Sequence, residues 1–287
     1  IDHPLTFFGP YNEFTGTGKE IGWPLMRDQG NSAYMRDTGD PKTAEGGQIE
    51  WGYYEETNPR LCHPRDLLEK HEARLSPSQR DLDMEQVLEP LERAIELTPI
   101  LGELGYNESH SFNGFLQVTT DGGPSMGESQ KVRGLWYAVA IWVKDGPGMG
   151  KLIADWMTDG RTAIDHHAID YSRFYPHQMT EQFIWDRCTE TEMKVYNPAV
   201  HPREPFSKGR NIRRSPFYER EKELGGHFME LGGWERAHGY AANEHLLEKY
   251  GDRIPVRENE WDNRHFWRVS NAEHLALSAD CGIINLS

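Results

Sequence analysis

The longest hydrophobic run extends from Leu135 to Val143 and predicts a strand buried on both faces. Glycines at 146, 148 and 150 follow and predict a loop whose backbone can approach a ligand. A helical pattern closed by Gly160 comes next, with hydrophobic residues at Leu152, Ile153, Trp156 and Met157. A helix that starts after a strand directs N–H groups and a positive dipole end at one point. The pattern is compatible with a bound anion or cofactor edge, and equally with packing alone.

The first 60 residues read as strands and turns. Residues 23–36 predict a hairpin around the turn 28–31, and Tyr34 and Arg36 would share one face of its second strand. Residues 48–54 predict another strand with an aromatic face. We therefore expect an antiparallel sheet, whose aromatic face covers either a core or a ligand.

Helical periodicity follows over residues 64–105. It is loose at 64–75 and clearer over 84–97, where Pro90 is expected to break or kink the helix. Residues 111–120 then predict a strand that leads into the turn Asp121, Gly122, Gly123 and Pro124. A turn-forming role is the commonest one for such an aspartate, although Asp121 could also bind or catalyse.

Residues 161–260 differ in character. Histidines 166, 167 and 177 lie near carboxylates, but they lack the spacing of a helical metal site, so no metal is expected. The basic residues 210–214 could bind an anion or pair with the glutamates of 219–223. A helix is predicted over 216–224, and Gly232–Gly233 predicts a tight turn.

Composition narrows the choice of function. The chain has 287 residues, 37% of them hydrophobic, which suffices for a core. A formal charge of -15 argues against nucleic-acid binding, because phosphate neutralisation needs a basic face. The three cysteines are far apart, which favours a reducing compartment, and we expect the cytoplasm or the mitochondrial matrix. No hydrophobic run approaches the ~20 residues that span a bilayer, so no membrane association is expected.

The common nucleotide-binding motifs and the H-E-x-x-H zinc motif are absent from the sequence. It contains no G-x-G-x-x-G, Walker A or H-E-x-x-H segment. The chain begins with Ile rather than Met and ends in a segment that reads as the start of a strand. We therefore expect an internal fragment of a longer protein, and the residues alone predict an α+β protein with a glycine-rich site beside an aromatic sheet.

An ordered set of short motifs resembles one family of flavoenzymes. The motifs are Phe112-Asn113-Gly114, Thr120 to Pro124, Gly127-Glu128-Ser129, Gly134-Leu135-Trp136, Ala140 to Val143, Arg213 to Phe217, Glu223-Leu224-Gly225 and Gly232 to Arg236. In this order they resemble the flavin-dependent dimethylglycine oxidase, dimethylglycine dehydrogenase and sarcosine dehydrogenase family. The likeness covers roughly residues 20–260.

The resemblance implies a three-part protein. Residues 1–110 would form the substrate-side antiparallel sheet with helices, and 111–165 the segment that returns to a glutathione-reductase-like FAD domain. Residues 166–260 would form a central domain. Residues 261–287 would begin a folate-binding domain like the glycine-cleavage T-protein. The FAD-linking histidine and the pyrophosphate-binding glycines would lie outside this chain, and a homo-oligomer is compatible with this layout.

The implied reaction is oxidative demethylation of a small methylated amine such as dimethylglycine or sarcosine. FAD would accept a hydride, and tetrahydrofolate would take the one-carbon unit. Tyr34, Arg36 and Trp142 are the implied substrate-binding residues, with Arg36 the carboxylate partner. Cofactor binding is implied for Asp121, Gly122, Gly123, Pro124, Val143, Lys144, Asp145 and Gly146. The N–H groups of Lys144, Asp145 and Gly146 would face the flavin N1/C2=O edge.

The chain departs from the family pattern at two places. His3-Pro4-Leu5 stands where the family often has His-Gln-Tyr, and the loop 144–148 lacks the usual small, Ser-rich residues. Two alternatives therefore stay open. The protein could be a non-catalytic regulatory homologue, or a folate-dependent demethylase that acts on a betaine or a sulfonium compound.

Overall fold

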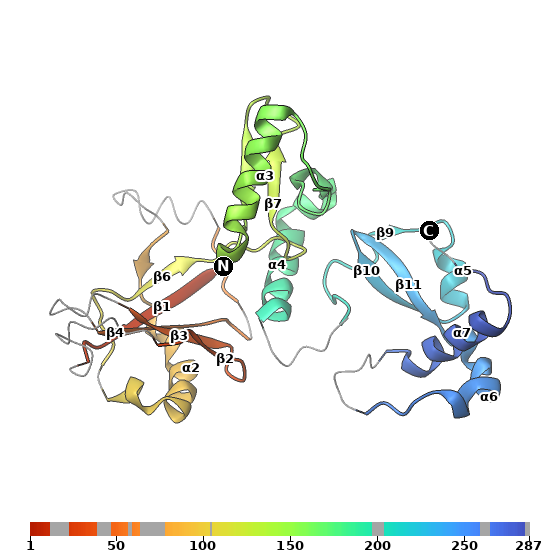
Figure 1. Ribbon diagram of the computed structural model, residues 1–287, viewed down its shortest axis with the longest axis horizontal. Helices are drawn as coiled ribbons and strands as arrows, with labels where there is room; N and C mark the ends of the chain where they lie inside the picture. Colours follow the sequence, from red (N-terminus) through yellow and green to blue (C-terminus); the bar gives the residue numbers. More distant parts are fainter. Residues whose placement is uncertain are drawn as a thin grey trace. The chain divides into compact units, whose positions relative to one another are not determined.

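The computed structural model describes residues 1–11, 23–38, 47–56, 59–63, 78–103, 105–196, 204–258 and 265–284 (Figure 1). Two compact units divide the chain. Unit 1 comprises residues 1–171 and 191–198, and unit 2 comprises residues 172–190 and 199–287. The predicted helical segment 64–75 lies outside the described residues. The assignment of chain segments to parts of a larger protein stays a prediction.

A six-stranded antiparallel sheet forms the base of unit 1. Its strands run in the order β2-β3-β4-β1-β6-β5. The strands are β1 (Asp2–Phe8), β2 (Met26–Asp28), β3 (Ala33–Thr38), β4 (Gln48–Tyr53), β5 (Arg80–Asp81) and β6 (Phe112–Phe115). The predicted β2–β3 hairpin, the strand at 48–54 and the antiparallel sheet are confirmed.

Helix α2 (Met84–Leu97) covers one face of this sheet, below it in Figure 1. Its buried side chains join strand residues such as Met35 and Trp51 in a single core. Asp83 caps the helix start by accepting a hydrogen bond from the Glu85 N–H, and a short 3-10 turn (Pro99–Gly102) follows the helix end.

We predicted a break or a kink at Pro90; helix α2 continues through Pro90, so the break is wrong. A proline has no N–H to donate to the carbonyl four residues earlier, here that of Gln86. The Tyr53 hydroxyl donates to this carbonyl instead, at 2.5 Å. The sheet therefore supplies the hydrogen bond that the helix lacks, which removes one reason for a break.

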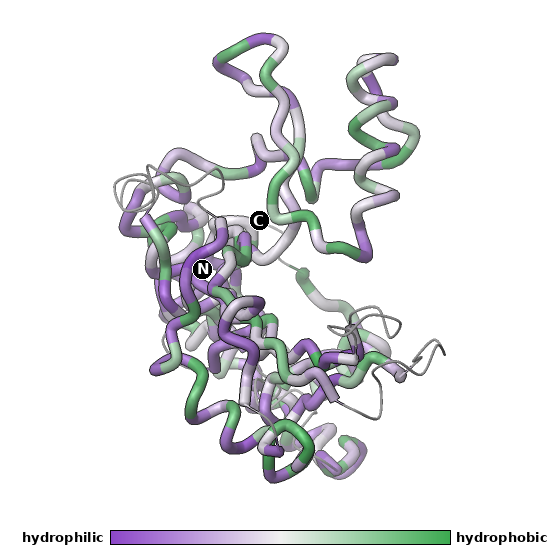
Figure 2. The backbone as a smooth tube through the Cα atoms, turned by 90° about the vertical axis from the view of Figure 1, so that its left-hand side faces the viewer, coloured by the Kyte–Doolittle hydropathy of each residue, from purple (hydrophilic) through white to green (hydrophobic). Residues whose placement is uncertain are grey.

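The segment Leu135–Val143 is not a strand buried on both faces. Only β8 (Trp136–Val139) is extended, and it pairs with β7 (Ser125–Glu128) alone in a two-stranded ribbon. Tyr137 and Val139 are exposed because no further strand flanks β8 among the described residues. Figure 2 shows hydrophobic stretches along the ribbon and the neighbouring helix at the top of the view.

Glycines 146, 148 and 150 lie in a helix rather than in the predicted loop. A 3-10 turn (Val143–Asp145) leads directly into α3 (Gly146–Asp159), which ends at Gly160 in the left-handed conformation, as predicted. Trp156 of α3 contacts Trp136 of β8 edge to face, at 5.5 Å between ring centroids. This contact packs the helix against the β7–β8 ribbon.

Helix α4 (Glu181–Tyr196) was not predicted from the sequence. It is weakly amphipathic and rich in charged residues, so hydrophobic periodicity gave little signal. Its C-terminal residues, 191–196, belong to unit 1. Thr191 donates a hydrogen bond to the Thr120 carbonyl, and Gly122 lies against the Thr191 and Val195 methyl groups.

Unit 2 is built on a three-stranded sheet in the order β10-β11-β9. Its strands are β9 (Arg213–Arg214), β10 (Gly226–Leu231) and β11 (Trp234–Tyr240), and its helices are α5 (Tyr218–Glu223), α6 (Leu246–Tyr250) and α7 (Trp267–Ala279). The helix within 216–224 and the tight turn at Gly232–Gly233 are confirmed. Residues 281–284 are not in a strand, and 285–287 lie outside the described residues.

Candidate functional site

A cleft of about 830 Å³ opens in unit 1 beside the β2–β3 hairpin. Three segments far apart in the sequence line it: the sheet, residues 140–144 before α3, and the end of α4. The lining residues include Leu25, Arg27, Gln29, Tyr34, Tyr54, Ala140, Ile141, Trp142, Val143, Lys144, Val195 and Tyr196. Aromatic rings and two cations thus meet at one place.

Stacked aromatic rings form one wall of this cleft. The Tyr54 and Tyr196 rings stack at 3.8 Å between centroids with an interplanar angle of 5°, and Trp142 stacks on Tyr196 at 5.6 Å. The Arg27 guanidinium lies 4.8 Å from the Tyr54 ring centroid. The Lys144 ammonium lies 4.9 Å from the Trp142 ring centroid. The faces of this wall therefore already attract cations of the protein itself.

Tyr34 connects the cleft to a partly buried histidine, His3. Its hydroxyl oxygen lies 3.0 Å from Nε2 of His3, and the His3 ring also stacks on Tyr54. Tyr34 faces Gly52 across the β3–β4 pair, and a Cβ at Gly52 would overlap the Tyr34 ring. The absence of a side chain at Gly52 thus lets the Tyr34 ring lie over β4 and reach His3. Burial, the largest cause, raises the pKa of Tyr34, so its hydroxyl stays protonated.

Two buried carboxyl groups lie behind the aromatic wall. Glu55 accepts a hydrogen bond from Gln86 on Oε1, while its Oε2 has no hydrogen-bond partner among the described residues. Glu192 on α4 is fully buried, and neither of its oxygens has such a partner in the described chain. Burial and then the charge of Glu55 raise the pKa of Glu192 to about 8. At neutral pH Glu192 is therefore mostly protonated.

Four of the predicted site residues line the cleft. They are Tyr34, Trp142, Val143 and Lys144. The predicted carboxylate partner, Arg36, does not line it: its Nε and Nη2 both donate to Glu50 Oε2, at 3.1 and 2.8 Å. Arg27 is the guanidinium that the structure brings to the cleft instead.

The other predicted cofactor residues lie outside the cleft. Asp121 accepts hydrogen bonds from Thr119 and from the Gly123 N–H, so it stabilises the turn 121–124. The N–H groups of Asp145 and Gly146 both donate to the Trp142 carbonyl. The predicted use of these two N–H groups to bind the flavin edge does not fit this arrangement.

The surface at the start of α3 has room for a planar ring. Val143 is 97% exposed, and a Cβ added at Gly146, Gly148 or Gly150 would meet nothing within 4 Å. Beside it, Trp142 offers a ring face and Lys144 a positive charge. These residues fit the ring part of FAD and an anionic edge. The sequence has no phosphate-binding glycine motif for the dinucleotide part.

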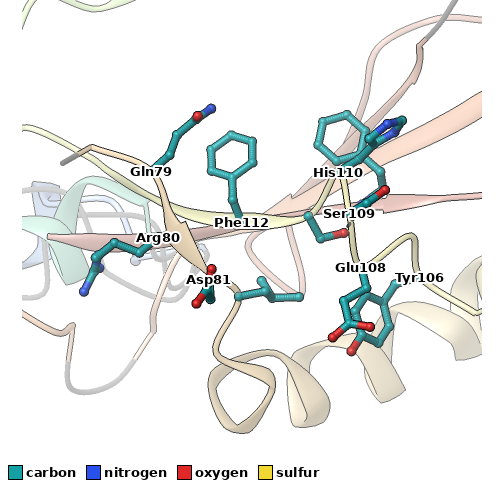
Figure 3. Close-up of a pocket in the computed structure, with 11 residues that line it drawn as sticks. Gln79, Arg80, Asp81, Tyr106, Glu108, Ser109, His110 and Phe112 are labelled. Carbon is teal, nitrogen blue, oxygen red and sulfur yellow. Dashed lines mark hydrogen bonds between the residues drawn. The ribbon is translucent and has the colours of Figure 1, made fainter. Parts of the chain in front are cut away.

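A second cavity, of about 670 Å³, lies at the β5–β6 edge of the same unit. Figure 3 shows Glu108 and Tyr106 close together and away from Arg80. The Arg80 guanidinium is already used, because it pairs with Asp2 and lies over the Phe115 ring. Among the described residues, the only guanidinium that lines this cavity is therefore paired, whereas Arg27 in the cleft donates to the neutral groups Gln29, Ser32 and Tyr196.

The described residues contain no group of three or more His, Cys, Asp or Glu side chains arranged to hold a metal ion. Of the predicted histidines, His166 contacts the Trp156 ring and His167 pairs with Asp165. Of the basic residues 210–214, Arg210 pairs with Glu235 and Arg214 with Glu219, which favours the pairing alternative. In the part of the chain that the structure describes, no helix is long and apolar enough to cross a membrane.

Sequence reasoning missed several residues around the cleft. Arg27 and Tyr54 belong to strands that were predicted, so the aromatic and basic content of the hairpin was the available signal. Glu192 and Tyr196 lie on α4, which was not predicted, and nothing in their local sequence indicates the cleft. His3 is connected to the cleft by its contact with the Tyr34 hydroxyl, and Glu55 lies 3.9 Å from the other ring nitrogen of His3. Neither contact can be predicted from the local sequence.

Comparisons with known proteins agree with a flavoprotein. Residues 159–215 match the family model of the FAD dependent oxidoreductase central domain. The chain is 29% identical over 235 residues to 4-methylaminobutanoate oxidase (formaldehyde-forming) of Paenarthrobacter nicotinovorans, covering 80% of this chain and 26% of that protein. It is 29% identical over 220 residues to the mitochondrial pyruvate dehydrogenase phosphatase regulatory subunit of Mus musculus, covering 74% of this chain and 23% of that protein.

Mitochondrial dimethylglycine dehydrogenase of Rattus norvegicus is 24% identical over 298 residues, covering 100% of this chain and 32% of that protein. The chain thus spans about a quarter to a third of the length of these curated relatives. The similarities support the resemblance to FAD-dependent oxidoreductases, and they do not distinguish one particular member.

Proposed function

We propose that this chain forms the amine-binding part of an FAD-dependent oxidoreductase that demethylates an N-methylated amino acid. The observation that carries the proposal is the cleft in unit 1. It combines an aromatic wall, two cations at its lining and buried carboxyl groups behind it. The names of two relatives, a 4-methylaminobutanoate oxidase and a dimethylglycine dehydrogenase, point to the same class of substrate.

The lining residues suit a substrate that carries both charges. A methylated ammonium group is a soft cation, and we propose that it binds against the ring surface of Tyr54, Tyr196 and Trp142 that the stack leaves uncovered. The substrate carboxylate would pair with Arg27 or Lys144. One of these two residues thus takes the place of Arg36, which was predicted as the carboxylate partner.

FAD, when bound, supplies the hydride acceptor for the N-methyl carbon. Trp142 and Lys144 would hold the ring part of the cofactor against the cleft, with Lys144 next to its anionic edge. The protein's own task is then to orient the amine and to remove its proton, since an ammonium nitrogen has no lone pair with which to assist hydride loss.

The fate of the one-carbon unit is the finer part of the proposal. Transfer to tetrahydrofolate follows from the resemblance stated above, whereas one relative is named as formaldehyde-forming. The two fates give different products. Free formaldehyde in the absence of tetrahydrofolate, and methylene-tetrahydrofolate in its presence, would support the transfer.

The experiment uses the protein expressed from its complete gene and reconstituted with FAD. Anaerobic addition of dimethylglycine, sarcosine or 4-methylaminobutanoate should bleach the visible flavin absorbance. Trp142→Leu and Arg27→Met should weaken this response, since they remove a wall and a carboxylate partner of the cleft. Arg36→Met is the matched control, because its guanidinium pairs with Glu50 outside the cleft.

Two results would reject the proposal. One is the absence of bound flavin after reconstitution, and the other is a flavin that no methylated amine bleaches. Flavin binding without bleaching would favour the non-catalytic alternative, which the similarity to a pyruvate dehydrogenase phosphatase regulatory subunit motivates.

A further inference from the structure

Arg213 of unit 2 contacts two aromatic rings from other segments of the chain. It is part of β9 and lies opposite Trp234 of β11. Its guanidinium carbon lies 3.4 Å from the ring centroid of Tyr175 and 4.1 Å from a ring centroid of Trp234. These rings attract the positive charge through their π-systems. The N–H donors lie in the plane of the guanidinium, so stacking on rings leaves them available.

The residues around Arg213 hold Tyr175 in place. The Tyr175 N–H donates to Oε1 of Gln178 at 2.9 Å. Gly233, which is in the left-handed conformation, lies against the same ring, where a Cβ would be 3.4 Å from Cδ2 of Tyr175. A hydrogen bond with Trp234, and next the charge of Arg213, lowers the pKa of Tyr175. The aromatic contacts thus restrict the guanidinium before any ligand binds.

Neighbouring arginines of unit 2 have carboxylate partners, whereas Arg213 does not. Arg187 pairs with Glu230, Arg210 with Glu235 and Arg214 with Glu219. Within the described part of the chain, Arg213 forms no ion pair with a carboxylate. Its charge is therefore balanced by aromatic rings and solvent alone.

The two buried or half-buried glutamates on the strands beside β9 are already engaged. Glu235 accepts hydrogen bonds from the guanidinium of its arginine partner on both oxygens, and one from a backbone N–H. Glu230 accepts one bond from its arginine partner and one from the Gly233 N–H. Neither can pair with Arg213 without giving up these bonds. In a chain of formal charge -15, Arg213 thus keeps an uncompensated positive charge.

The positive charge at this point is that of one guanidinium. His177 lies beside Tyr175, with 6.1 Å between the ring centroids. Burial, and next the charge of Arg213, lowers the pKa of His177, so its imidazole is neutral at pH 7. One planar cation matches a carboxylate monoanion, whose two oxygens can each accept from one N–H of the guanidinium fork. A phosphate dianion needs more positive charge than these residues supply.

We propose that Arg213 is the anchor of a carboxylate-binding site on unit 2. The ligand is a carboxylate monoanion, supplied either by a small organic acid or by an acidic side chain. Because the rings already restrict the arginine side chain, less of its conformational entropy is lost on binding. Only residues of unit 2 carry this inference, so it stands independently of the function proposed for the cleft.

The test uses the protein expressed from its complete gene and the arginine reagent phenylglyoxal, with mass spectrometry to locate each modified residue. Sodium acetate is the first probe and replaces sodium chloride at constant ionic strength. Acetate should slow the modification of Arg213 in a saturable manner. Modification of Arg214, whose guanidinium pairs with Glu219, should change little. Sodium phosphate at the same ionic strength should protect Arg213 less than acetate does.

Two variants test the part that the rings play. Tyr175→Leu should raise the acetate concentration that gives half protection by about 3- to 10-fold, the effect of one lost cation–π contact and a freer arginine side chain. Phe217→Leu removes an exposed ring that is not one of the two stacked on Arg213, and should leave this concentration unchanged. Equal effects of the two variants would overturn the role assigned to the rings.

A blocked peptide that carries one glutamate distinguishes the two sources of the carboxylate. Protection of Arg213 at a lower concentration of peptide than of acetate would support an acidic side chain as the ligand. Protection by acetate at an equal or lower concentration would support a small organic acid. The proposal is overturned if Arg213 shows no saturable protection, if Arg214 is protected equally, or if phosphate protects as well as acetate.

Discussion

Two buried glutamates show how differently the two units treat a carboxyl group. Glu235 in unit 2 is 3% exposed, and its oxygens accept hydrogen bonds from Arg210 and from the Asn211 N–H. Burial raises the pKa of Glu235, but these bonds outweigh it and leave the pKa below its ordinary value. Glu192 in unit 1 is equally buried, has no such partners in the described chain, and has its pKa raised to about 8.

Glu235 is a buried carboxylate whose hydrogen bonds stabilise the fold, whereas Glu192 is a buried acid without such bonds in the described chain. Unit 2 pairs its buried charges, and Arg187 with Glu230 repeats the pattern of Arg210 with Glu235. Unit 1 leaves a carboxyl pair and an imidazole nitrogen uncompensated behind a cleft. Perturbed groups of this kind gather at functional sites because stability alone would not retain them.

The largest expected loss of stability comes from breaking a compensated pair in unit 2. Arg187→Leu leaves the buried Glu230 without its guanidinium, which should lower the free energy of unfolding by about 3–5 kcal/mol. Denaturant unfolding measures it. Lys151→Met, which removes an exposed pair with Asp155, is the control and should change stability by less than about 1 kcal/mol. Equal effects of the two variants would contradict the distinction.

In unit 1 we predict the opposite result, a substitution of a buried acidic residue that stabilises the protein. The folded-state pKa of Glu192 lies above the unfolded value, so its stabilising contribution is complete below about pH 4.5 and is lost as the pH rises through about 8. Glu192→Gln should therefore become more stable relative to wild type between pH 5 and pH 9. The gain is on the order of 1.4 kcal/mol for each unit between the two pKa values. Unfolding at several pH values tests this, and a constant difference would refute it.

The smallest effect concerns a polar group that unit 1 does compensate. Tyr53→Phe removes the hydroxyl that donates to the Gln86 carbonyl. Because this buried carbonyl then lacks a donor, the free energy of unfolding should fall by about 1–3 kcal/mol. Pro90→Ala restores an N–H to the same carbonyl. The double variant should therefore lose less stability than the sum of the two single changes. Strict additivity would show that the carbonyl finds another donor.

The sequence predicted the local elements better than the cleft. Hairpin residues, the α2 periodicity and Gly232–Gly233 specify their own conformations, so these elements could be read directly. The break predicted at Pro90 does not occur, because the hydrogen bond that the proline removes is replaced by one from Tyr53, a residue of another element. The prediction of a strand buried on both faces at Leu135–Val143 was wrong, because hydrophobic content alone does not distinguish a covered strand from an exposed two-stranded ribbon.

The cleft depends on contacts between distant segments. Tyr34, Trp142 and Lys144 were predicted through a family resemblance, and the structure brings them to one lining. Glu192 and Tyr196 come from a charged helix without strong periodicity, and His3 matters only because Gly52 lets Tyr34 reach it. Local patterns carry no information about such long-range placement.

The central claim is that unit 1 keeps an uncompensated acid behind the cleft, and infrared spectroscopy tests it most directly. Difference spectra of wild type against Glu192→Gln should show the C=O stretch of a protonated carboxylic acid at pH 7. This band should disappear as the pH rises through about 8, in line with the raised pKa of Glu192. A carboxylate band already complete at pH 7, with no protonated acid that depends on Glu192, would contradict the account.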